Sequence, residues 1–167
     1  MHSSPPLVVT LTLDEAAHEY FTMLRTKHFP KHCNYLEAHL TLFHHLPSEE
    51  SLVDDTLQNL LLLQPLELEV TGLKNMGNGV AFTIECVELM VLHKNLQQSL
   101  SSYLISQDRK KLWPHITVQN KVTAFKAKQT LELLLENFQP FSATGIGVDT
   151  WLYMQGPWLH QRHYEFK

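Results

Sequence analysis

Two short stretches of the same form constrain the fold of this chain more than any other feature of its sequence. They cover residues 38–43 and 114–119, and each contains the pattern His, apolar, Thr, apolar. Apolar and polar residues alternate in both, which predicts a β-strand in which residues i and i+2 share a face. His39 and Thr41 would then point to one side, as would His115 and Thr117, while the apolar residues between them enter a core.

These four side chains suit acid–base chemistry. An imidazole has an unperturbed pKa of about 6.5, so one histidine can accept a proton while the other donates one. Two hydroxyls can donate hydrogen bonds to a developing oxyanion. A single His-x-Thr in a strand is common by chance, but two copies in matching surroundings favour a functional pair. The sequence does not decide which histidine would be the base.

The order of predicted elements suggests a duplicated α–β unit. A helix that begins near Asp14 precedes His39, a helix that begins near Leu89 precedes His115, and another helix follows each motif. Sequence identity between the two halves is low outside the motifs. The evidence for a repeat is therefore this order of elements. Periodicity and turn residues predict helices over 14–27, 48–63, 89–106 and 123–137, and strands over 7–13, 35–44, 66–71, 80–86, 113–119, 141–148, 149–154 and 158–166.

Composition excludes several classes of protein. The 167 residues are enough for one domain with a real core, and no linker divides them. A net charge of −4, from 13 basic and 17 acidic residues, argues against an extended nucleic-acid surface. We expect no membrane span and no signal peptide. Cys33 and Cys86 lack CxxC spacing, so we expect a reduced, cytoplasmic chain.

Eleven histidines raise the possibility of a metal site, but their spacing does not support one. His28 and His32 are four residues apart, yet Pro30 would break a helix between them, and His44 and His45 are adjacent. No cysteine or acidic residue completes a familiar ligand set. We therefore expect no metal and no other cofactor.

The two motifs resemble the signature of the 2H phosphoesterases, a family that includes RNA 2′,3′-cyclic phosphodiesterases historically called 2′-5′ RNA ligases. The segment 113–121 and the late Gly156-Pro157-Trp158 look like a bacterial branch of that family. The resemblance covers most of the chain in element order. It implies an α+β, bilobal fold of residues 1–167 with pseudo-twofold symmetry, antiparallel sheets around a central cleft, and helices outside.

The resemblance also implies a metal-independent phosphoesterase with His39, Thr41, His115 and Thr117 as catalytic residues. Its partner would be a nucleotide or RNA end bearing a 2′,3′-cyclic phosphate, bound by a monomer. Many members that act on RNA ends have an arginine shortly after the second motif, where this chain has Gln119-Asn120-Lys121. This departure leaves the substrate class open.

Three weaker candidates for substrate binding come from continuing the alternation along each strand. Phe43 would share the face of His39 and stack on a base, whereas Gln119 and Lys121 would share the face of His115, with Lys121 reaching a phosphate. A packed core aromatic and a solvated lysine are the favoured alternatives. Two other functions also stay open: a non-catalytic module that binds a phosphorylated nucleotide or RNA end, and a ligase-like reversal of the reaction.

Overall fold

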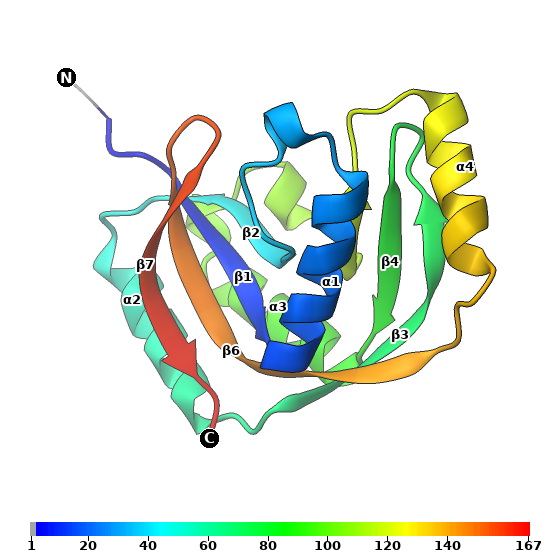
Figure 1. Cartoon of the computed structure of the whole chain (residues 1–167). Coiled ribbons are helices and arrows are strands. Elements are labelled where there is room, and N and C mark those ends of the chain that lie inside the picture. Colours follow the sequence, from blue (N-terminus) through cyan, green and yellow to red (C-terminus); the bar gives the residue numbers. More distant parts are fainter. Residues whose placement is uncertain (1–2) are drawn as a thin grey trace.

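The structure is a computed structural model that describes residues 3–167, apart from the side chains of residues 61 and 62. Its strands form one antiparallel sheet in the order β2-β1-β6-β3-β4-β5, with β7 also paired to β6. The sheet curls strongly, with α2 and α4 on its two flanks, α3 behind it and α1 in front of its middle (Figure 1). The predicted α+β fold is confirmed. The strands are β1 Leu7–Leu13, β2 Leu40–Leu46, β3 Leu66–Asn75, β4 Val80–Glu85, β5 His115–Gln119, β6 Phe141–Tyr153 and β7 Trp158–Glu165.

The order of elements repeats, as the sequence predicts. The first half runs β1-α1-β2-α2-β3 and the second runs β4-α3-β5-α4-β6, with β7 added at the end. The two motif strands, β2 and β5, form the two ends of the sheet order. Short 3-10 turns follow α2 and α3. The helices are α1 Glu15–His28, α2 Ser51–Gln58, α3 Val87–Ser99 and α4 Ala124–Leu135.

Strand β6 joins the two lobes. Its first residues pair with β3. It pairs with β1 on one edge from Gly145 onwards, and with β7 on the other edge from Gly147 onwards. One lobe therefore holds β2, β1, β6 and β7, and the other holds β5, β4, β3 and the start of β6. The expectation of two strands over 141–148 and 149–154 was wrong, because one continuous strand changes its partner halfway along.

Other boundaries also differ from the sequence prediction, and strand β3 continues to Asn75 rather than ending at residue 71. Strand β2 begins at Leu40 rather than at residue 35, and a 3-10 turn and extended chain precede it. Helix α2 is shorter than 48–63, and no side chain caps its start. Helix α3 ends at Ser99 rather than near 106, because the chain turns at Leu100 and Leu104 to bury both leucines.

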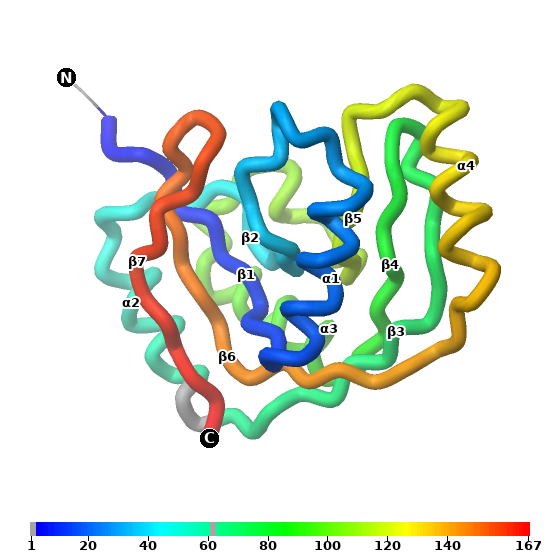
Figure 2. Tube along the Cα trace, in the orientation of Figure 1, coloured from blue at the N-terminus to red at the C-terminus, as the bar shows by residue number. Residues whose placement is uncertain are grey.

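The first helix of each half contacts the motif strand of the other half, and Figure 2 shows α1 beside β5. Helix α1 contacts β5, and its Phe21 packs edge-on against Phe82 of β4 with ring centroids 5.1 Å apart. Helix α3 reaches the first motif, where the His93 Nε2–H donates to the carbonyl oxygen of Leu42 at 2.9 Å. The two halves thus exchange helices, and neither motif strand is supported by its own half alone.

Candidate functional site

The two motif histidines have the same local geometry. His39 lies just before β2, and its Nδ1 is 2.8 Å from the carbonyl oxygen of Glu37. His115 opens β5, and its Nδ1 is 2.7 Å from the carbonyl oxygen of Trp113. A carbonyl oxygen can only accept, so Nδ1 carries the hydrogen in both rings. Each neutral imidazole therefore keeps the lone pair of Nε2 free for a ligand.

The curl of the sheet brings the two motifs together. Strands β2 and β5 are at opposite ends of the strand order, yet they contact each other. The charge of His115 is also one of the causes that lower the pKa of His39. Both rings are half-buried. The arrangement is thus a pair of imidazoles, one from each lobe.

The pKa of both histidines is lowered in the free protein. Burial lowers the pKa of His39 to about 4, helped by the charges of Arg25, His115 and His44 and opposed by the carbonyl of Glu37. Burial also lowers the pKa of His115, helped by His44 and Lys74 and opposed by the carbonyl of Trp113. Both imidazoles are therefore neutral at pH 7 when no anion is bound.

The motif threonines lie on the same faces as their histidines. Thr41 pairs with Thr10 of β1, and Thr117 pairs with Ala81 of β4. Both threonines are half-buried, and the Thr117 hydroxyl is 4.0 Å from the Met76 sulfur. Each hydroxyl is therefore available at the same surface as an imidazole.

The structure does not bring the weaker candidate Phe43 to this surface. A bulge in β2 shifts its register between the Phe43 and Thr41 pairs with β1, so Leu42 and Phe43 are both buried. The Phe43 ring stacks on His93 with centroids 4.7 Å apart and has no exposed surface. The favoured alternative, a packed core aromatic, is therefore confirmed, and the weaker hypothesis that Phe43 stacks on a base was wrong because it assumed a regular strand.

Gln119 and Lys121 are not at the site either. Gln119 is fully buried, and its amide donates to the Thr130 hydroxyl at 2.8 Å. Lys121 is exposed beyond the end of β5 and has a left-handed backbone with φ of 60°. The predicted alternation ends at Val118, because the glutamine side chain bonds inward to α4.

Arg25 of α1 is a buried cation that sequence analysis did not identify. It donates from Nε to Asn34 at 2.9 Å and from NH1 to the carbonyl oxygen of Thr117 at 3.2 Å. Its guanidinium also lies over the Phe29 ring, 4.1 Å from the centroid. Burial lowers its pKa to about 10, so it stays charged at pH 7. Arg25 thus fixes the second motif strand and places a positive charge near His39.

Asp108 is a second residue that sequence analysis missed, because it lies between the predicted helix over 89–106 and the predicted strand over 113–119. Its buried carboxylate accepts hydrogen bonds from the backbone N–H groups of His44 and His45 at 2.9–3.0 Å. The His44 Nδ1 is also 3.1 Å away. Burial alone would raise the pKa of Asp108, but these bonds outweigh it and lower the pKa, and they hold the end of the first motif strand. The adjacent pair of histidines gave no signal of this contact.

A tryptophan ring lies against each motif histidine. Trp113 stacks on His115 at a centroid distance of 4.0 Å and an angle of 11°, and Lys74 Nζ lies 4.6 Å from the Trp113 ring centroid. Trp158 lies 4.6 Å from His39 at an angle of 51°. Both histidines thus contact a tryptophan, but the angle between the rings differs, so the two sides of the site are not identical.

No helix among the described residues combines the length and apolar character needed to cross a membrane. Within the same part of the chain, no three His, Cys, Asp or Glu side chains are grouped so that they could share a metal ion.

Solved structures show the class of fold. TT0787 of Thermus thermophilus is 18% identical, with a TM-score of 0.69 over 96% of this chain and 97% of that chain. LigT of E. coli, solved with 3′-AMP, is 15% identical, with a TM-score of 0.62 over 99% of both chains. A structure described as a phosphoesterase is 14% identical, with a TM-score of 0.64 over 99% of both chains. The fold is therefore that of the two-lobed LigT-like α+β proteins.

Sequence comparison identifies the family. The family model described as the 2′-5′ RNA ligase superfamily matches residues 13–156, which is most of the chain and includes both motifs. The chain belongs to this superfamily, the 2H phosphoesterases, and membership supports a phosphoesterase-type activity. No curated protein matches the chain.

Proposed function

We propose that this protein hydrolyses the 2′,3′-cyclic phosphate of an RNA end or small nucleotide by metal-independent acid–base catalysis. The observation that carries the proposal is the pair of equivalent histidines, each with Nδ1–H held by a backbone carbonyl and Nε2 left free. Opening a cyclic phosphodiester needs one group to deprotonate water and one to protonate the leaving oxygen. LigT of E. coli, which shares the fold, has been solved with 3′-AMP and with ATP.

The different environments of the two histidines favour one division of roles. His39 has the more strongly lowered pKa and is the better candidate for the neutral base, because it takes up a proton only near pH 4. In the proposed step, His39 Nε2 removes a proton from water while the water oxygen attacks phosphorus. The bond from phosphorus to one ribose oxygen breaks, and the imidazolium form of His115, which carries a second proton on Nε2, gives that oxygen its Nε2 proton and becomes the neutral ring. The product is a phosphomonoester.

The threonine hydroxyls are proposed to donate to the non-bridging phosphate oxygens. Negative charge grows on these oxygens as water attacks, so donors fixed in advance lower the barrier. Arg25 is a positioning residue in this scheme, because it holds the backbone of Thr117 from the other half of the chain.

The proposed activity is tested with a panel of 2′,3′-cyclic nucleotides and short RNAs ending in a cyclic phosphate. We expect turnover to a phosphomonoester in the presence of EDTA, with the position of the product phosphate assigned by phosphorus NMR. Loss of turnover in EDTA with rescue by one divalent ion would contradict the mechanism. Tight binding of a nucleotide without turnover would favour the binding module, and formation of 2′-5′ linkages would favour the ligase.

The pH dependence follows from the lowered pKa values. His39 must be neutral, so kcat/KM should fall as the pH drops through about 4. His115 must carry a proton, so kcat/KM should also fall as the pH rises through its pKa, which lies below 6.5. We expect a bell-shaped profile of kcat/KM with its maximum between these values, since this parameter reports the free enzyme. A maximum above pH 7 would overturn the assignment of roles.

Removing one threonine hydroxyl should slow the chemical step without changing the shape of the site. Thr41→Val and Thr117→Val should each lower kcat by about 10–10³-fold, by analogy with the loss of one oxyanion donor. The matched controls Thr41→Ser and Thr117→Ser keep the hydroxyl and should recover most of the rate. Equal losses in the valine and serine variants would show that packing, rather than hydrogen bonding, is the role of these residues.

A further inference from the structure

A hollow beside His39 has the character of a binding site for a flat ring. It encloses about 220 Å³, and we call it the aromatic hollow because its lining includes His39, Tyr35, Trp151 and Trp158. Pockets for drug-sized ligands usually measure about 300–1,000 Å³, so this space suits one part of a ligand. It opens directly next to the proposed base of the reaction.

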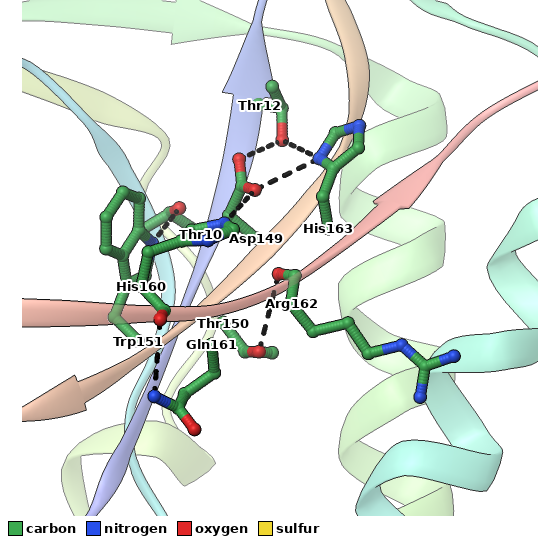
Figure 3. A network of polar contacts seen from close by, with 9 residues as sticks. All are labelled: Thr10, Thr12, Asp149, Thr150, Trp151, His160, Gln161, Arg162 and His163. Atoms are coloured by element: carbon green, nitrogen blue, oxygen red, sulfur yellow. Dashed lines mark hydrogen bonds and ion pairs between the residues drawn. The ribbon is translucent and has the colours of Figure 1, made fainter.

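Contacts among strands β1, β6 and β7 hold Trp151 in place. Its indole N–H donates to the Thr10 hydroxyl at 2.9 Å, and its ring meets the His160 ring edge-on at a centroid distance of 4.8 Å. His160 Nε2 is in turn 2.9 Å from the Asp149 carboxylate, which also contacts His163 (Figure 3). Trp151 is therefore preorganised, and a ring that stacks on it does not have to order it first.

The rings form a path towards the reactive histidine. Trp158 lies between Trp151, at 6.2 Å, and His39, at 4.6 Å, measured between ring centroids. Tyr35 is 60% exposed and closes the hollow from the loop that precedes β2. Trp158 and Trp151 therefore follow His39 as two successive aromatic rings.

The other side of the site cannot accept a stacked base in the same way. Trp113 is covered on one face by His115, and the Lys74 ammonium lies over the same ring. A larger hollow of about 740 Å³ contains neither motif histidine. Its lining includes Glu67, Glu69, Glu85 and Glu88, whose charges would repel a phosphate.

A polar group at the rim could distinguish between bases. The Glu37 side chain is 73% exposed and lines the hollow together with His18, whose Nε2 is 3.1 Å from the Glu37 carboxylate. A carboxylate accepts hydrogen bonds from amino groups, such as N4 of cytosine. The backbone carbonyl of Glu37 also holds the His39 ring. The segment 37–39 would therefore contact the base through the Glu37 side chain and the phosphate through His39.

We propose that the aromatic hollow binds the base of the nucleoside that carries the phosphate, and that Glu37 favours bases with an exocyclic amino group over uracil. The inference rests on the proposed function, because it places the phosphate between His39 and His115. Stacking on aromatic side chains tolerates every base, so the hollow supplies affinity and Glu37 supplies the preference.

The test compares substrates with and without a base. In Tyr35→Leu and Trp151→Leu, KM for 2′,3′-cyclic AMP should rise about 5- to 150-fold, the range expected for losing one stacking partner. KM for glycerol 1,2-cyclic phosphate, which has no base, should not change. Tyr153→Leu alters an exposed tyrosine outside the hollow and serves as the control. Equal effects on both substrates, or none on either, would overturn the proposal.

A second variant and a binding measurement separate this inference from the proposed function. Glu37→Gln should reduce the preference for 2′,3′-cyclic CMP over 2′,3′-cyclic UMP, and an unchanged ratio would contradict the role of Glu37. Binding of 3′-AMP, followed by tryptophan fluorescence, needs no turnover. Weaker binding in Tyr35→Leu than in Tyr153→Leu would support the hollow even if no cyclic phosphate were hydrolysed, and equal binding in the two variants would overturn it.

Discussion

Replacing His39 or His115 with alanine should lower kcat for a 2′,3′-cyclic nucleotide by about 10²–10⁴-fold, because each variant loses one positioned acid or base. The double variant should be little slower than the slower single variant, since groups that act together in one step are not additive. Steady-state and single-turnover kinetics on the best substrate of the panel measure both effects. The expected size is the same for both residues, because each would carry one proton transfer and each has its Nδ1–H fixed by a backbone carbonyl.

A matched control for these variants is His45→Ala. His45 follows the same motif, its side chain is exposed, and its backbone N–H bonds to Asp108 in any variant. Its kcat should remain close to that of the wild-type protein. Near wild-type turnover in His39→Ala or His115→Ala would contradict the two-histidine mechanism. The function as a non-catalytic binding module would then be favoured.

The Gly79→Ala variant should be the most destabilised of the simple substitutions, with the free energy of unfolding lowered by about 3 kcal/mol. Gly79 is buried where the turn before β4 meets the end of β5. An added Cβ would overlap the carbonyl of Gln119 and lie 2.7 Å from the Cα of Asn120. These are backbone atoms, so relief requires β5 to move, which would also displace the second motif. Urea unfolding followed by circular dichroism measures the loss.

The neighbouring Gly77→Ala variant separates lack of space from backbone strain. Gly77 has a φ of +94°, and nothing lies within 4 Å of the position that a Cβ would take there. Its only penalty is the left-handed backbone, which costs about 1–2 kcal/mol for an L-residue with a side chain. Equal destabilisation in the two variants would show that the contact with Gln119 does not limit the fold.

The spacing of apolar residues predicted most of the helices and strands, because the buried face of each element determines that spacing. The motif strand around His115 and the helix after Asp14 were predicted to within two residues at most boundaries. Strand β6 was divided in two because its change of partner near Gly145 is a tertiary event. The burial of Phe43 could not be predicted from the sequence either, because the bulge in β2 depends on how β2 pairs with β1.

The candidate site was predicted only as far as its motifs. Spacing placed His39 with Thr41 and His115 with Thr117, because the period of a strand is local. Arg25 and Asp108 were missed because each acts on a strand that is far from it in sequence. The burial of Gln119 was missed for the same reason, since its partner Thr130 lies on the following helix.

The exchange of helices between the halves bears on how such a chain could arise by duplication. Helix α1 supports the strand of the second motif through Arg25, and α3 supports the strand of the first through His93. A single ancestral half would bury its helix only against another copy of itself. Two identical copies would then build a paired site as a swapped homodimer, with one histidine from each subunit. Fusion of the copies into one chain would preserve that site and let its two sides diverge, as the different settings of Trp113 and Trp158 illustrate.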